Sequence, residues 1–100
     1  MNLSAIKLCW EELQQSTQAS ELRTSKLNNV DLEQLKSELT QQLNKLLISN
    51  TDINKNIGSF SQSTKTLEKI IPDLKGHEQV FYAKLYRVCI LVTDYYSQGR

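Results

Sequence analysis

The chain has few residues that end or bend a helix, since it contains one proline and three glycines among 100 residues. Proline and glycine mark most turns, so their scarcity leaves few places where the chain can reverse. This composition favours a small number of long helices. One hundred residues are enough for one domain, and we predict a single helical domain over residues 1–100.

An excess of charge of one sign is also missing. Twelve Lys and Arg stand against eleven Asp and Glu, which gives a formal net charge of +1. A nucleic-acid-binding protein normally carries a basic face, because neutralising phosphates contributes much of its affinity. The balanced charges therefore predict no direct binding to nucleic acid.

Long apolar runs are absent as well. The most apolar stretch, residues 80–96, is interrupted by three charged residues and is shorter than the ~20 apolar residues of a membrane-spanning helix. The first residues show no basic leader followed by an apolar run. Cys9 and Cys89 lie far apart within apolar helical patterns, which favours buried free thiols in a reducing compartment. We expect a cytoplasmic or nuclear protein that is neither secreted nor inserted in a membrane.

The side chains that catalytic and metal sites need are sparse. His77 is the single histidine, and the pattern around it predicts a turn with no adjacent nucleophile. Cysteine and histidine pairs with metal-ligand spacing are missing, and the three glycines are too isolated to form a phosphate-binding loop. We expect no enzyme activity, no metal and no cofactor.

Apolar residues at steps of three or four predict the first helix, over about residues 3–27, with Leu3, Ile6 and Trp10 on its buried stripe. Asn28 and Asn29 then interrupt the stripe. Asparagine tolerates left-handed backbone and also caps helices, so these two residues predict a tight turn before the next helix.

The second helix is predicted over about residues 31–71 from a stripe of leucines and isoleucines in heptad spacing. Asn50 occupies a core-facing position, where Asn sets register or partner number; the alternative is that it marks a helix end. Gly58 is the weak point, because Ser59 and Gln62 fit a capping box that would start a new helix. The predicted fold is all-α, with antiparallel hairpins around one long coiled-coil-like helix. The alternative is a compact four-helix bundle broken near Gly58.

Pro72 ends the second helix and leads to the third, over about residues 78–96. This helix is apolar on most sides, so it must be covered on most sides, and one antiparallel neighbour cannot do that. We therefore predict that partner chains cover it. The predicted interface consists of Phe81, Tyr82, Leu85, Tyr86, Val88, Val92, Tyr95, Tyr96 and Trp10. Core packing is the alternative for Phe81 and Trp10.

The segment from Leu32 to Tyr96 is similar in general pattern to small helical subunits of hetero-oligomeric assemblies, such as the lysosome-related organelle biogenesis complex and the outer-kinetochore ring complex. An Asn-, Gln- and Ser-rich heptad helix followed by an aromatic helix carries this resemblance, and it transfers no functional residue. We expect a non-catalytic subunit of a helical complex in trafficking, cytoskeletal or chromosome machinery. A small chaperone or adaptor for one client, as in secretion systems, and a homodimeric coiled-coil protein are the alternatives.

Overall fold

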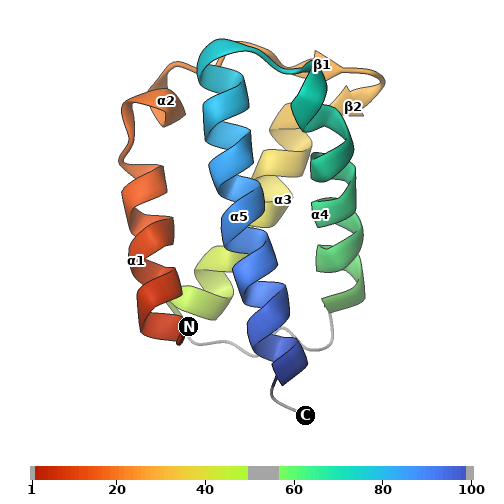
Figure 1. The fold of residues 1–100 in the computed structure, drawn as a ribbon. Coiled ribbons are helices and arrows are strands. Elements are labelled where there is room, and N and C mark those ends of the chain that lie inside the picture. The colour runs from red at the N-terminus through yellow and green to blue at the C-terminus, as the bar shows by residue number, and fades with distance from the viewer. Residues whose placement is uncertain (1, 50–56, 99–100) are drawn as a thin grey trace.

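The computed structural model describes residues 2–49 and 57–98. These residues are mostly helical, which confirms the predicted class (Figure 1). The elements in chain order are α1 (Leu3–Gln14), α2 (Thr17–Ser20), β1 (Lys26–Leu27), β2 (Val30–Asp31), α3 (Leu32–Leu47), α4 (Ile57–Ile70), the 3-10 turn η2 (Ile71–Asp73) and α5 (Gly76–Gln98).

Helix α5 is the centre of the arrangement. It lies between α1 and α4 and contacts both, and the short α2 packs against its first turns (Figure 1). Helix α3 contacts α1 and α4 and lies behind α5 in the same view. The result is compact, with a radius of gyration of 13.0 Å and extents of 36 × 25 × 19 Å.

The first helix is shorter than predicted, because α1 ends at Gln14 rather than near residue 27. The Ser16 hydroxyl donates to the carbonyl of Leu13 at 2.7 Å and accepts from the amide of Ala19 at 3.3 Å. A serine side chain that bonds nearby backbone in this way competes with helix continuation. Beyond it the predicted stripe is polar and buries too little surface to extend the helix.

The turn at Asn28 and Asn29 is confirmed. Both residues have positive φ, 51° and 65°, as the two central residues of a tight hairpin turn require. They join β1 to β2, which pair antiparallel. Asp31 then begins the next helix, since its side chain accepts from the amide of Gln34 at 3.1 Å.

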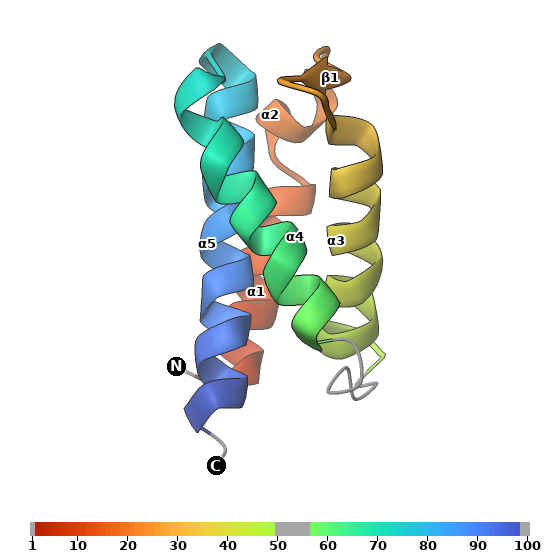
Figure 2. The ribbon, with the colours of Figure 1, turned by 90° about the vertical axis from the view of Figure 1, so that its right-hand side faces the viewer.

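The prediction of one unbroken helix over residues 31–71 is wrong. Helix α3 ends at Leu47, α4 begins at Ile57, and the two run antiparallel side by side (Figure 2). An unbroken helix would be roughly 60 Å long at ~1.5 Å per residue, which exceeds the longest extent of 36 Å. Ser59 lies inside α4, so the predicted capping box does not start this helix. Heptad spacing does not distinguish one helix from two that each place a stripe against the same core.

The third helix is confirmed, and it extends two residues further at each end than predicted. Gly76, at φ 59°, opens it in a left-handed conformation that suits glycine. Helices α1, α2 and α4 of the same chain contact α5, so the expectation that other chains must cover it is corrected. Within the described residues, no helix is long and apolar enough to cross a membrane.

Candidate interaction surface

Six of the predicted interface residues lie in the protein's own core. Their side chains are at most 4% exposed, because the other helices of this chain cover them. A partner could reach them only if those helices separated, so the folded chain does not present them as a surface. These residues are Trp10, Phe81, Tyr82, Leu85, Val88 and Val92.

The other three predicted interface residues are tyrosines of α5 that the core covers less. The Tyr86 hydroxyl donates to the carboxylate of Glu68 on α4, and this hydrogen bond raises the pKa of Tyr86. Tyr95 is 37% exposed, and its ring meets that of the half-buried Tyr96 edge to face at 5.7 Å. Asn50, the predicted register-setting residue, lies outside the described residues.

His77 makes a surface contact with a carboxylate that the sequence pattern did not predict. Its Nε2 lies 2.6 Å from a carboxylate oxygen of Glu21, and both side chains are about half exposed. The neighbouring Glu78 accepts from the backbone amide of Arg23 at 3.0 Å. The two contacts attach the segment after α2 to the start of α5. Across residues 2–49 and 57–98, no group of three or more His, Cys, Asp or Glu side chains could hold a metal ion.

The two thiols have different environments. Cys89 is fully buried, and burial raises the pKa of its thiol to about 12. Cys9 is exposed on α1. The prediction of a buried thiol is therefore confirmed for Cys89 and wrong for Cys9.

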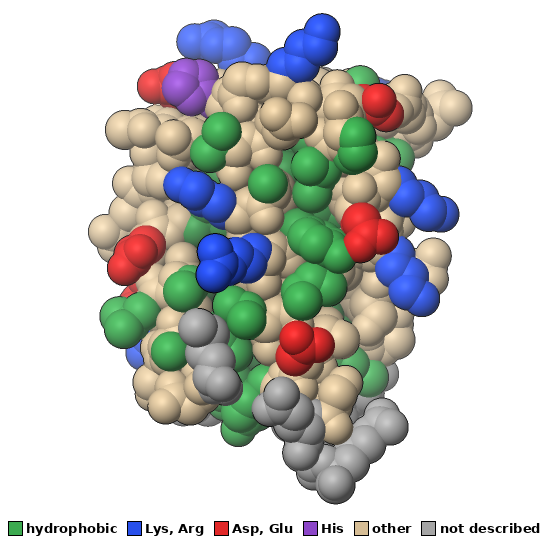
Figure 3. Space-filling model, viewed as in Figure 1, with side chains coloured by type: hydrophobic (Ala, Val, Ile, Leu, Met, Phe, Trp, Pro, Cys, Tyr) green, Lys and Arg blue, Asp and Glu red, His purple; other side chains and the backbone are tan. Residues whose placement is uncertain are grey.

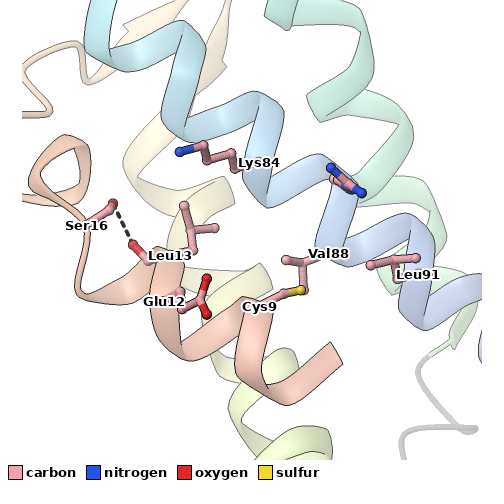
Figure 4. A pocket seen from close by; sticks show the side chains of 8 residues that line it. Cys9, Glu12, Leu13, Ser16, Lys84, Val88 and Leu91 are labelled. Atoms are coloured by element: carbon pink, nitrogen blue, oxygen red, sulfur yellow. Dashed lines mark hydrogen bonds between the residues drawn. The ribbon is translucent and has the colours of Figure 1, made fainter. Parts of the chain in front are cut away.

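A groove with an apolar floor lies between α1 and α5, and the sequence pattern did not predict it. It has a volume of about 380 Å³, and side chains of both helices face it from opposite sides (Figure 4). We call it the α1–α5 groove. The residues that line it are Cys9, Glu12, Leu13, Ser16, Lys84, Arg87, Val88 and Leu91.

The groove has an apolar floor and a charged rim. Leu13 and Val88 are buried at its floor, and Leu91 is half-buried beside them. Glu12 on α1 and two basic residues on α5, Lys84 and Arg87, are exposed at the rim. Figure 3 shows basic and hydrophobic side chains next to each other over these two helices.

Leu8 is an exposed hydrophobic residue of α1 that lies outside the lining of the groove. It is 61% exposed, more than any other large hydrophobic side chain that the structure describes. It lies one helical turn before Glu12 and therefore on the same side of α1. Leu8 lies off the stripe formed by Leu3, Ile6 and Trp10, and this offset is the signal by which the sequence marks it as exposed.

The rim charges are unpaired within the part of the chain that the structure describes. Neither Lys84 nor Arg87 forms an ion pair or a side-chain hydrogen bond there, and the same holds for Glu12. Their charged groups are therefore free to meet charges of another molecule.

Comparisons with family models, with curated proteins and with solved structures find no significant match for this chain.

Proposed function

We propose that this protein is a non-catalytic subunit of a hetero-oligomeric helical complex, and that it binds another helical chain along the α1–α5 groove. In this proposal α1, α3, α4 and α5 act together as a compact four-helix bundle. The bundle holds the two walls of the groove at a fixed separation and presents them to the partner.

The observation that carries the proposal is the apolar floor of the groove, formed by the buried Leu13 and Val88 with the half-buried Leu91. An amphipathic helix binds in such a groove by placing hydrophobic residues, spaced by three or four, against an apolar floor. Single exposed hydrophobic residues are common on soluble proteins and need no explanation. Leu8 is not among the residues that line the groove, but it lies one helical turn before the rim residue Glu12.

The test begins with the purified chain, whose mass in solution is measured by light scattering at micromolar concentration. Partners are then isolated from the native cell, identified, produced separately and mixed with the chain. We expect a monomer alone and a stoichiometric complex with more than one other chain. A symmetric dimer alone would support the homodimer alternative, and a complex with one client that is later released would support the chaperone alternative. Either result would contradict the proposal.

Two substitutions test whether the groove is the contact surface. Leu8→Asp and Leu91→Asp each place a carboxylate where the partner would exclude water, which costs several kcal/mol when the charge has no partner. Both should prevent assembly and leave the helical content of the free chain unchanged. Ser37→Asp, at an exposed position of α3, is the matched control and should assemble normally. Equal assembly by all three variants would exclude the groove as the binding site.

A further inference from the structure

We propose that the groove binds an acidic amphipathic helix from a different protein, with carboxylates that face Lys84 and Arg87. This inference rests on the proposed function, because it identifies the kind of partner that the same surface accepts.

One side of α5 carries a stripe that lies mostly outside the core, and Leu91 is the member of it that packs against the core. Val80, Lys84, Arg87, Leu91 and Tyr95 follow one another at steps of four, three, four and four residues, so they lie on one side of the helix. Val80 and Tyr95 are 40% and 37% exposed. The stripe is about 22 Å long at ~1.5 Å per residue, or roughly four helical turns. It is apolar at both ends and basic in the middle.

The opposite wall, on α1, carries less charge. Glu12 is its one charged residue in the groove, with Cys9 and Leu13 next to it. The two walls together have two positive charges against one negative charge. An occupant that matches this field has more acidic than basic residues, with the acidic ones on the side that faces α5.

A second copy of this chain fits the charges less well. In a symmetric dimer the same patch meets itself, so two Glu12 carboxylates would face four positive charges from Lys84 and Arg87 of the two copies. Two positive charges would remain without a partner at the interface. An acidic helix leaves no such excess, and for this reason we favour a different protein over self-association.

The pattern of the occupant follows from the floor. Hydrophobic residues at steps of three or four would pack against Leu13, Val88 and Leu91, and glutamates on one flank would reach Lys84 and Arg87. Exposed ion pairs are screened by salt, so the acidic flank should make binding weaker at high ionic strength.

The experiment uses the full chain and two synthetic helical peptides of about 18 residues, long enough at ~27 Å to span the stripe. The peptides share one Leu and Ala stripe and differ only on one flank, which is Glu in the first and Lys in the second. Binding is measured by fluorescence anisotropy at low and high ionic strength. We expect the Glu peptide to bind at least about tenfold more tightly than the Lys peptide at low ionic strength.

Charge reversal at the rim provides the matched variants. Lys84→Glu with Arg87→Glu should reverse the order of affinity, so that the Lys peptide binds more tightly. The new glutamates of α5 would then repel those of the Glu peptide and attract the lysines of the other. Lys45→Glu with Lys65→Glu changes the net charge equally at exposed positions away from the groove and should leave the order unchanged. Circular dichroism checks that each variant is folded.

The outcomes separate this inference from the proposed function. Three results would overturn the acidic-helix inference. The two peptides could bind equally, neither could bind, or both double variants could change the peptide affinities in the same way. Suppose that Leu8→Asp abolishes binding of the native partner while the charge reversal at Lys84 and Arg87 leaves that binding unchanged. In that case the proposed function stands and this inference fails. Self-association that requires Glu12 would also overturn it, in favour of a second copy.

Discussion

The indole N–H of Trp10 donates a hydrogen bond to the side-chain oxygen of Asn44 at 2.8 Å, and so joins α1 to α3 across 34 residues of sequence. The Trp10 side chain is 1% exposed, and its nitrogen can only donate, so it needs an acceptor inside the protein. The bond holds one flank of α1 against α3. The other flank of α1 is the wall of the α1–α5 groove.

Asn44→Ala should lower the free energy of unfolding by about 1–3 kcal/mol, because the buried indole N–H would have no acceptor. Urea unfolding followed by fluorescence measures this change well, since Trp10 is the single tryptophan. Gln41→Ala removes a similar amide from an exposed position of α3 and should change stability by less than about 0.5 kcal/mol. Equal effects of the two substitutions would show that the hydrogen bond adds nothing to stability.

Leu85→Ala should destabilise the free chain by about 2–5 kcal/mol, because Leu85 is 0% exposed and its loss leaves a cavity between α5 and its neighbours. Leu8→Ala removes the same atoms from an exposed position and should cost less than about 0.5 kcal/mol. Thermal unfolding of the isolated chain compares the two. If Leu85→Ala were harmless without a partner, the core would not be formed within one copy, and partner chains would have to cover α5.

Two glycines should respond to alanine in opposite directions. Gly76 has φ 59°, which strains any L side chain, so Gly76→Ala should destabilise the protein by about 1 kcal/mol. Gly58 lies inside α4 with open space around it, so Gly58→Ala should stabilise by about 0.5–1 kcal/mol. Urea midpoints of the two variants test the sign directly. A loss of stability in both would indicate that α4 does not include Gly58.

Stability should fall at alkaline pH because of two buried groups of α5. Burial, with the negative charges of Glu78 and Glu33, raises the pKa of Tyr82 from 10.0 to about 12, and burial raises the pKa of Cys89 from 9.0 to about 12. Both groups lose their protons more easily in the unfolded chain. The stabilisation from their neutral forms is therefore complete below about pH 9 and is lost progressively as pH rises towards about 12.

Urea unfolding over this pH range checks the assignment. Tyr82→Phe and Cys89→Ala should each make the alkaline fall in stability shallower, whatever they do to stability at neutral pH. Tyr95→Phe, at an exposed position of the same helix, should leave the dependence of the free energy of unfolding on pH as it is in the unmodified chain. If none of these substitutions changes this pH dependence, the loss of stability at alkaline pH must come from other groups.

Local features of the fold could be predicted from the sequence, because they depend on neighbouring residues. The turn at Asn28 and Asn29 needs only residues that tolerate positive φ, and helix α5 has an apolar pattern strong enough to define its range. The start of the second helix, predicted at about residue 31, is confirmed, with Asp31 as the N-cap of α3.

The features that depend on distant contacts could not be predicted in the same way. The leucines before Leu47 and the apolar residues after Ile57 keep one helical phase, so their spacing is compatible with one helix or two. The apolar pattern of α5 showed that several elements must cover it but did not identify them as α1, α2 and α4 of the same chain. For Phe81 and Trp10 the sequence leaves a partner surface and core packing both open, and the structure buries them in the core.

The groove was missed because it is formed by residues outside the buried stripes. Lys84, Arg87 and Leu91 share one side of α5, and Leu8 and Glu12 share one side of α1, but each pair of helices offers several relative orientations. Only the packing of α1 against α5 places these two sides together.

The most direct test of the proposed binding surface is an NMR titration of the isotopically labelled chain with its reconstituted partner, in which backbone amide shifts report the contact residue by residue. We predict that the largest changes fall on α1 and α5 around Leu8, Glu12, Lys84 and Leu91, while the amides of α3 around Ser37 stay in place. Changes concentrated on α3, with the two walls of the groove unaffected, would contradict the account.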